Sequence, residues 1–287
     1  MSKYKRIYEK QHKKIQARFS TIIYTLFGAF IIPRGGQAHV ASLIKLVRPL
    51  GFSANAIRLG LSRMSRKGVF KVRKVGRRSY YSLSTKGFRW MEQGRVRAFV
   101  FEPKSWDGRW RLVVYNVPEK LRVLRDRLRF KLHSLGFANL STSLWISPYD
   151  FFSEIETFTE GKKMSRYIET FEAEYKGKRK IKELVAVVWQ LDELARRYQA
   201  FIRKYSVMYA RHKRPARAGR SIDLADCFGK RFCISAEYVA LRLDDPMLPL
   251  ELLSKDWPGI EAQRLYRKMC DSLKTPADEF VDLVLKR

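Results

Sequence analysis

The stretch SANAIRLGLSRMSRKGVFKVRKVGRRSYYSL, from Ser53 to Leu83, decides the fold of this chain. Its first half places apolar residues at helical spacing and ends at Gly68, a residue type that commonly follows the last turn of a helix. Its second half holds two short β-type runs on either side of Gly76, which predicts a hairpin. A turn needs the glycine but not the two arginines that follow it, Arg77 and Arg78, so the hairpin tip indicates an anionic partner.

The predicted helix has two different faces. We expect Ser53 to cap it by accepting a hydrogen bond from an otherwise unpaired backbone amide. The side that should turn into the core holds Ala54, Ile57, Gly60, Leu61 and Met64. The opposite side holds residue types that can bind base edges and phosphates or pack on a thymine methyl group: Asn55, Arg58, Leu59, Ser62, Arg63 and Arg66. An ordinary solvated helix face is the alternative, and the absence of acids on this side disfavours it.

The hairpin supplies a second set of cations. Gly76 allows the tight turn, and the side chains expected to anchor the hairpin on the protein body are Phe70, Val72, Tyr81 and Leu83. The cations expected to reach a phosphate backbone or a minor groove are Lys71, Arg73, Arg77 and Arg78. A basic, solvent-facing hairpin without a ligand is the alternative.

Two helices are expected before this stretch. Phe19 to Ile32 reads as a mostly buried helix that breaks at Pro33-Arg34-Gly35-Gly36, and His39 to Val47 reads as a second helix that a turn at Pro49 and Gly51 ends. The order of helix, helix, turn, helix and basic hairpin is that of a winged helix-turn-helix. The hairpin and a basic arm at residues 3–18 would then strengthen binding to any duplex, while the third helix chooses the sequence.

Charge is unevenly distributed along the 287 residues, whose formal net charge is +31. Residues 1–100 hold 23 Lys and Arg against two acids, a balance of +21, whereas residues 223–287 are nearly neutral. Such self-repulsion indicates a polyanionic partner, of which nucleic acid is the commonest and an anionic membrane surface the alternative. The sequence has no run of 18 apolar residues and no apolar signal core at its N-terminus, so we expect a cytoplasmic protein without membrane association.

The middle of the chain reads as a second domain that follows a linker at Gly94 to Ser105. The expected elements are a strand at Trp110 to Val117, a basic helix at Glu119 to Leu135, short strands within Ala138 to Ser147, a helix near Phe151 to Thr159, and further strands at Tyr167 to Tyr175 and Glu183 to Gln190. The β-α-β-β-α-β order suits a ferredoxin-like domain.

A nucleic-acid-processing nuclease built on this domain is the alternative function. A metal-dependent nuclease needs carboxylates that converge on a divalent cation at strand ends, but the first expected strand has no acid and Asp107 lies before it. The four histidines are dispersed, and the three cysteines, Cys227, Cys233 and Cys270, have no zinc-site or disulfide spacing. We therefore expect no catalytic residue, no metal and no cofactor.

The last third of the chain is expected to be mainly helical. Leu191 to Tyr205 is amphipathic with an aromatic stripe typical of a core, and Glu261 to Leu273 should be a final helix in a bundle or a dimer face. Between them lies a basic loop, Arg211 to Arg220, which could bind a CoA phosphate, contact DNA or remain solvated. The candidate effector contacts in it are Arg211, Lys213 and Arg214.

Motifs along the whole chain together resemble those of the PaaX-type bacterial transcriptional repressors of phenylacetic acid catabolism. In chain order the motifs are PRGG at 33–36, LIKLVRPLG at 43–51, AIRLGLSRMSRKG at 56–68, VGRRSYYSLSTKG at 75–87, WDGRW at 106–110, LGFANLSTSLWISP at 135–148, WQLDELARRYQAFI at 189–202 and DPMLPLELLSKDWPG at 245–259.

The resemblance implies an α+β repressor with three domains: a winged helix-turn-helix at 1–97, a ferredoxin-like domain at 98–180 similar to small CRISPR-associated nucleases, and a helical effector and dimerisation domain at 181–287. It also implies a homodimer that an aryl-CoA thioester, phenylacetyl-CoA, releases from an operator in double-stranded DNA. The chain departs from the family pattern at AEYVAL, Ala236 to Leu241, where a basic, His-containing stretch is usual, and at Asp244, where Arg is usual. If that stretch touches the effector or the dimer partner, the effector or the pairing has changed.

Overall fold

The computed structural model describes residues 19–100, 102–161, 164–217 and 222–286, and it leaves out the side chains of residues 213–217. The chain packs as two compact units. Unit 1 consists of the residues up to Val100 together with Ala200–Leu243 and Ile260–Arg287, and unit 2 consists of Phe101–Gln199 and Asp244–Gly259. The basic arm expected at residues 3–18 lies outside the described residues.

The described part of unit 1 begins with a helical segment whose hydrogen-bond period changes along its length. It comprises α2 (Phe19–Leu26), the π-helical turn η2 (Phe27–Ile31) and the 3₁₀ turn η3 (Ile32–Arg34). The segment ends at the predicted break, because Gly35 and Gly36 take left-handed φ angles of +89° and +70° that favour glycine. The next helices are α3 (Val40–Val47) and α4 (Ala54–Arg66), joined by the 3₁₀ turn η4 (Arg48–Leu50).

The sheet of unit 1 contains one strand that the sequence interpretation missed. Strands β2 (Phe70–Val75) and β3 (Arg78–Leu83) form the predicted hairpin, and β1 (Gln37–His39) pairs with the other side of β3 in the order β1-β3-β2. His39 therefore ends a strand and does not begin the second helix as expected. The three residues of β1 are too few to show a two-residue period in the sequence.

The expected linker after the hairpin is partly wrong. Helix α5 (Thr85–Arg95) continues through the π-helical turn η5 (Val96–Val100), so the first part of Gly94 to Ser105 is helical. Ser84 caps α5 because its hydroxyl accepts a hydrogen bond from the Gly87 amide at 3.0 Å. The segment after residue 101 is irregular up to the next strand.

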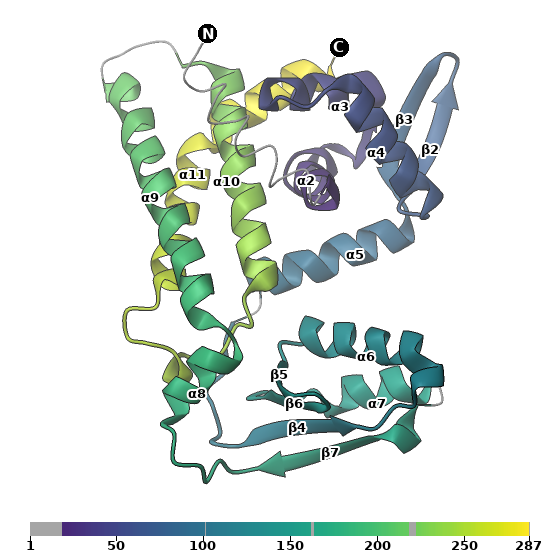
Figure 1. The fold of residues 1–287 in the computed structure, drawn as a ribbon. Helices are drawn as coiled ribbons and strands as arrows, with labels where there is room; N and C mark the ends of the chain where they lie inside the picture. Colours follow the sequence, from purple (N-terminus) through teal and green to yellow (C-terminus); the bar gives the residue numbers. More distant parts are fainter. Residues whose placement is uncertain (1–18, 101, 162–163, 218–221, 287) are drawn as a thin grey trace. The chain divides into compact units, whose positions relative to one another are not determined.

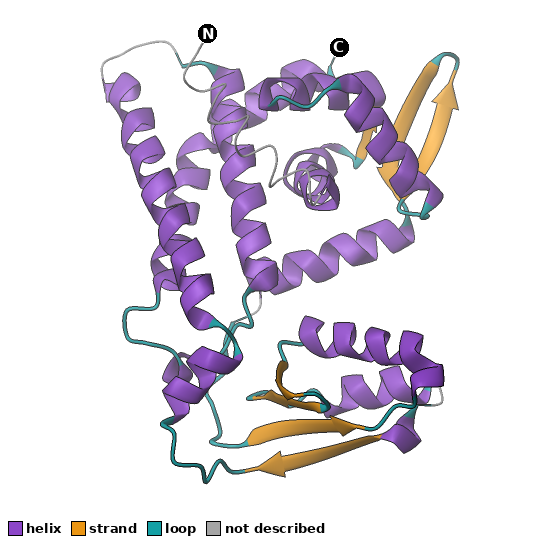
Figure 2. Cartoon of the chain, viewed as in Figure 1, coloured by secondary structure: helices purple, strands orange, loops and turns teal. Residues whose placement is uncertain are grey.

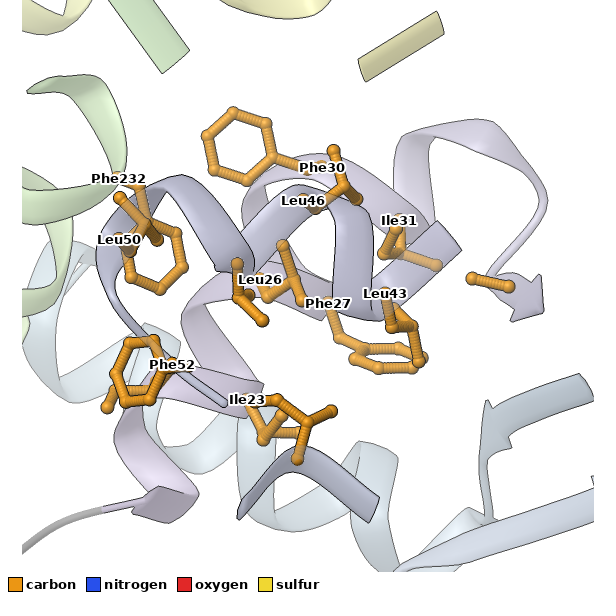
Figure 3. Packing of buried hydrophobic residues seen from close by; sticks show 14 of the residues in the cluster. Ile23, Leu26, Phe27, Phe30, Ile31, Leu43, Leu46, Leu50, Phe52 and Phe232 are labelled. Carbon is orange, nitrogen blue, oxygen red and sulfur yellow. The ribbon is translucent and has the colours of Figure 1, made fainter. Parts of the chain in front are cut away.

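One hydrophobic core joins the winged helix-turn-helix to the C-terminal helices α10 (Leu224–Asp244) and α11 (Pro258–Leu285) (Figure 1). Figure 3 shows Phe27, Phe30 and Leu46 in the same hydrophobic cluster as Phe232 of α10. The Phe30 ring lies 5.0 Å from that of Phe228, which is also on α10. The N-terminal helices and the C-terminal helices, which are far apart in the sequence, thus bury their apolar side chains in one core.

Unit 2 contains a four-stranded antiparallel sheet with two helices. The strands β4 (Trp110–Tyr115), β5 (Ala138–Ser141), β6 (Leu144–Ser147) and β7 (Ile168–Ala173) are arranged in the order β5-β6-β4-β7. Helices α6 (Arg122–Ser134) and α7 (Phe152–Glu160) pack against this sheet (Figure 2). The core between the helices and the sheet includes Val113, Leu128 and Ile155. The remaining turns are η6 (Glu119–Leu121), η7 (Ser165–Tyr167) and η8 (Leu250–Leu252). The predicted ferredoxin-like order is confirmed.

Three expectations for the second half of the chain are corrected. The strand expected at Glu183 to Gln190 is wrong, because Ile181–Val188 forms helix α8 and buries Leu184 and Val185 at adjacent helical positions. The basic loop expected from Arg211 is also wrong in its first part, because helix α9 (Leu191–Arg217) continues to Arg217. The final helix, expected to end at Leu273, continues to Leu285 as α11.

Candidate nucleic-acid interface

Helix α4 is fixed at both ends by its own sequence. At its start the Ser53 hydroxyl accepts a hydrogen bond from the Ala56 amide at 3.1 Å, as predicted. At its end Gly68 takes a φ of +73°, and the Val69 amide donates to the Met64 carbonyl at 2.9 Å. This six-to-one bond is that of a Schellman motif and turns the chain directly into the hairpin.

The inward face of α4 is close to that predicted. Ile57, Leu61 and Met64 are buried, while Ala54 and Gly60 are half-buried. Gly60 permits a close approach, because a Cβ atom there would lie 2.0 Å from the Phe19 ring of α2. Helix α4 thus lies close to α2 at this position, and a side chain there would have to displace the Phe19 ring.

The outward face of α4 is solvent-exposed along its whole length. The exposed residues on it are the six predicted ones, Asn55, Arg58, Leu59, Ser62, Arg63 and Arg66. In the described part of the chain none of these side chains has a hydrogen bond or ion pair, and Leu59 is 58 % exposed. Thirteen helical residues span about 20 Å at 1.5 Å per residue, and an α-helix fits the DNA major groove.

The hairpin has two distinct faces. The register pairs Phe70 with Leu83 and Val72 with Tyr81, so these four side chains lie on one face of the hairpin. Because successive side chains of a strand point to opposite faces, Lys71, Arg73 and Arg78 lie on the other face. Phe70 is buried, and Tyr81 and Leu83 pack on the core, as expected. Val72 is 43 % exposed, so its predicted anchoring role is wrong, and Tyr81 opposite it makes the contact with the core.

The basic side chains of the hairpin are not equivalent. Lys71, Arg77 and Arg78 are exposed, and the turn is formed by Gly76, with a φ of +56°, and Arg77. Arg73 instead donates a hydrogen bond to the Gln37 side chain at 2.9 Å. Its guanidinium also lies 5.4 Å from the centre of the Tyr80 ring. A fixed guanidinium loses less conformational entropy on binding than a free one.

Gln37 and Tyr80 are therefore residues that sequence reasoning missed. Gln37 lies on β1, the strand that the sequence did not reveal, and the Tyr80 ring lies 5.4 Å from that of His39 on the same strand. Both follow from the register, in which Tyr80 is opposite Arg73 on one side and His39 on the other. The residue pattern of the hairpin alone could not predict these contacts, because β1 is distant from the hairpin in the sequence.

Acidic residues are nearly absent from this region. Between residues 19 and 100 the sequence has a single acid, Glu92. Arg95 donates two hydrogen bonds to its carboxylate, at 2.6 and 2.8 Å, and these lower the pKa of Glu92. Among the described residues, no carboxylate forms an ion pair with the basic side chains of the outward face of α4 or of the hairpin, so both carry unpaired positive charge.

The candidate effector contacts and the departing stretch lie elsewhere in unit 1. Arg211 is exposed on α9, whereas the side chains of Lys213 and Arg214 lie outside the described residues. The stretch Ala236–Leu241 is on α10, and its Ala236, Tyr238 and Leu241 are buried. The Tyr238 ring stacks on the Tyr266 ring of α11 at 4.2 Å, so much of this stretch contributes to packing.

Asp107 and Glu172 are both paired with Arg111, and among the described residues they belong to no cluster of metal ligands. Arg111 donates a hydrogen bond to the Asp107 carboxylate at 2.8 Å, and this bond is the main cause that lowers the pKa of Asp107 to about 2. Among the described residues no group of three or more His, Cys, Asp or Glu side chains could hold a metal ion. Cys227 and Cys233 are buried free thiols, and Cys270 is a half-buried one. Within the same described part no helix has the length and apolar character to cross a membrane.

Comparisons with known proteins agree with this architecture. Residues 18–87 match the model of PaaX-like proteins, residues 103–185 that of the PaaX central Cas2-like domain, and residues 189–283 that of the PaaX-like C-terminal domain. The Transcriptional repressor PaaX of Escherichia coli K12 is 29 % identical over 249 residues, covering 86 % of this chain and 77 % of that protein. The solved structure of uncharacterized protein Rv0674 of Mycobacterium tuberculosis has a TM-score of 0.55, at 21 % identity over 92 % of this chain and 97 % of that one. The chain therefore belongs to the PaaX family.

Proposed function

We propose that this chain is a cytoplasmic transcriptional repressor that binds a specific operator in double-stranded DNA as a homodimer. The outward face of α4 carries this proposal, because its polar and basic side chains are exposed and have no partner in the described part of the chain. The membership in the PaaX family supports it, as does the name of the E. coli relative.

The α4 face and the hairpin would have different tasks. Asn55 and Arg58 are residue types that form paired hydrogen bonds with adenine and guanine, and Leu59 can pack against a thymine methyl group. Lys71, Arg73, Arg77 and Arg78 would bind phosphates, which add affinity for any sequence. Arg63 and Arg66 at the end of α4 could contribute to either task, and Ser62 to base contacts.

The controlled genes would be those of an aromatic-acid catabolic operon, with an aryl-CoA such as phenylacetyl-CoA as the releasing effector. Family membership supports this part of the proposal, and the exposed Arg211 on α9 is a candidate phosphate contact. Asp244, which stands where the family usually has Arg, pairs with Arg197 at 2.7 Å. Glu237, which lies within the departing stretch but matches the family pattern, pairs with Lys204. The alternative, a nuclease on the central domain, has no support from the acids of unit 2.

The test begins with selection of bound fragments from random and genomic DNA, followed by affinity measurements on the selected operator and on an unrelated duplex. Replacing Arg77 and Arg78 together by alanine should weaken binding to both duplexes. Two lost phosphate contacts lower the slope of log affinity against log salt by about 1.8, so the wild type loses roughly 12-fold more affinity between 50 and 200 mM salt than the variant does.

The α4 variants have a different expected result. Asn55→Ala or Arg58→Ala should reduce the preference for the operator over the unrelated duplex, by roughly 5- to 150-fold for a lost paired contact. The replacement of both Arg267 and Lys268 on α11 by alanine is the matched control for the Arg77 and Arg78 double variant. Both residues are exposed in the same unit, and their replacement removes the same charge. Equal losses on both duplexes for all three kinds of variant would contradict the proposal.

The effector part is tested separately. Phenylacetyl-CoA and other acyl-CoA esters are titrated into the complex of protein and operator, and release is followed by fluorescence anisotropy. We expect release by an aryl-CoA at lower concentration than by acetyl-CoA or free CoA. If no acyl-CoA causes release, the effector is wrong while DNA binding stands.

A further inference from the structure

The three-stranded sheet of unit 1 has a polar face opposite the one that covers the core. Its inner face carries Ala38, Phe70, Tyr81 and Leu83, which belong to the hydrophobic core of the unit or pack against it. Because successive side chains of a strand point to opposite faces, the alternate positions lie on the outer face. These positions are Gln37 and His39 of β1, Lys71, Arg73 and Val75 of β2, and Arg78, Tyr80 and Ser82 of β3. The outer face thus carries cations from two strands, and none of these positions is acidic.

Arg73 is a cation of the outer face that is held from two directions. Its guanidinium donates a hydrogen bond to the Gln37 side-chain oxygen at 2.9 Å, and this bond spans the sheet from β2 to β1. On β3, between these strands, the Tyr80 ring lies beneath the guanidinium, with its centre 5.4 Å from the guanidinium carbon. The His39 ring is the other neighbour of Tyr80, at 5.4 Å between ring centres. The hydrogen bond therefore sets the direction of the guanidinium, and the ring supports it by a cation–π contact.

The neighbouring cations are not held in this way. In the described part of the chain the side chains of Lys71, Arg77 and Arg78 have no hydrogen bond, ion pair or ring contact. Immobilising one such long side chain on binding costs about 2- to 12-fold in affinity. Because the Arg73 guanidinium has its place before any ligand binds, most of this cost does not arise for Arg73.

The chemistry of this arrangement favours a phosphate group as the ligand. A guanidinium presents its N–H donors in a rigid planar fork that matches paired oxygens, whereas the ammonium of a lysine acts as a point charge. Arg73 uses one donor on Gln37, and among the described residues its guanidinium has no other hydrogen bond, so the rest of the fork stays available. We propose that Gln37 is a positioning residue for DNA binding, which holds the Arg73 guanidinium over the Tyr80 ring in the orientation that binds a phosphate of the DNA backbone.

This inference rests on the proposed function and adds a task for β1, the strand beside the hairpin. It separates two contributions of Arg73 to the DNA affinity, its charge and its orientation. The charge determines the salt dependence, because each neutralised phosphate releases counterions. The orientation changes the affinity at every salt concentration and depends on Gln37. Variants can therefore distinguish the two contributions.

The first test measures the affinity of the full-length protein for the selected operator and for an unrelated duplex between about 50 and 200 mM salt. Gln37→Met keeps about the length of the side chain and removes the acceptor. It should weaken binding to both duplexes by about 2- to 12-fold for each hairpin that contacts DNA, with the salt slope of the wild type, because no charge is lost. Arg73→Met should also weaken both complexes, and it should lower the slope by about 0.9 for each hairpin.

The second test asks whether Gln37 acts through Arg73. Combined with Arg73→Met, Gln37→Met should cause no further loss, because the side chain that Gln37 positions is gone. Arg73→Lys keeps the charge but not the fork, so it should keep the salt slope of the wild type, bind more weakly and not respond to Gln37→Met. Tyr80→Leu should weaken binding as Gln37→Met does, and Tyr80→Phe, which restores the ring, should restore the affinity.

The matched control is Gln263→Met on α11, because Gln263 is half-buried in the same unit, as Gln37 is. It should bind both duplexes like the wild type. Three results would overturn the inference: a Gln37→Met variant with wild-type affinity, an equal loss from Gln37→Met in the wild type and in both Arg73 variants, or a loss that Gln263→Met matches. Failure of the proposed function looks different, because Arg73→Met and the double variant of Arg77 and Arg78 would then leave the affinity and the salt slope unchanged.

Discussion

Replacing Arg34 by methionine tests the connection between the winged helix-turn-helix and the C-terminal helices within unit 1. The Arg34 guanidinium donates hydrogen bonds to the Asp282 carboxylate at 2.6 Å and to the carbonyl oxygens of Phe30 and Asp278, each at 3.0 Å. It also lies 3.3 Å from the Asp278 carboxylate. Methionine keeps about the length of the aliphatic part of the side chain and removes all four interactions.

The expected cost follows from the surroundings of each partner. The two bonds to carbonyl oxygens contribute about 1 kcal/mol each. The Asp282 side chain is 48 % exposed, so water screens its ion pair and its contribution is below about 1 kcal/mol. Asp278 keeps a hydrogen bond from Arg231 at 2.8 Å, so no carboxylate is left buried without a partner. Arg34→Met should therefore lower the free energy of unfolding of unit 1 by about 2–3 kcal/mol.

The assay is scanning calorimetry of the full chain, with hydrogen exchange to assign the transition. A loss of this size lowers the melting temperature of a unit this large by roughly 4–12 °C. Protection should fall together in residues 19–34 and in α11, while the strands of unit 2 keep theirs. Arg95→Met is the control, because it removes an exposed ion pair with Glu92 and should leave the transition unchanged. An Arg34→Met variant with the melting temperature and exchange pattern of the wild type would refute the reasoning.

Two further predictions concern single positions. A Cβ atom on Gly87 would lie 2.1 Å from the Val69 carbonyl oxygen, so Gly87→Ala should destabilise unit 1 by about 1–3 kcal/mol in urea titrations. Gly94→Ala on the same helix, whose nearest atom is 4.0 Å away, should not destabilise it. Arg111 lowers the pKa of Asp107 from 3.8 to about 2. The ionised Asp107 therefore stabilises the fold fully above pH 4, and this stabilisation is lost as the pH falls toward 2. Asp107→Asn should make the melting temperature depend less on pH over that range. Identical pH profiles of the variant and the wild type would contradict this prediction.

The local parts of the interface could be predicted from the sequence. The cap at Ser53, the end of α4 at Gly68 and the buried face at Ile57, Leu61 and Met64 each depend on residues within one or two helical turns. The hairpin turn at Gly76 is equally local. For the same reason the exposure of the opposite face of α4 followed directly, since a helix with one buried stripe must present the other to solvent.

Elements that depend on distant partners could not be predicted. The run Val185 to Val188 is rich in β-branched residues, which favours a strand by propensity. In α8, however, the buried Leu184 and Val185 together with the half-buried Ile181 and Val188 follow helical spacing. Strand β1 exists because β3 offers it an edge, and its three residues have no signal of their own. Likewise, Gln37 holds Arg73 only after β1 has joined the sheet.

The shared core of unit 1 has a consequence for regulation. Phe30 of the first helical segment packs on Phe228 of α10, and Phe27 of the same segment lies 4.9 Å from Phe70 at the base of the hairpin. A ligand that shifts α10 or α11 thus acts on the packing beneath α4 and the hairpin, and it need not touch any side chain that we propose to contact DNA. Such a ligand can change the DNA affinity only by its own difference in affinity for the two arrangements, which at typical couplings of 1–3 kcal/mol is about 5- to 150-fold. Arg34 connects this segment to α11 through hydrogen bonds to Asp278 and Asp282. Arg34→Met removes these bonds, so it should reduce the response to an effector more than it reduces the operator affinity itself.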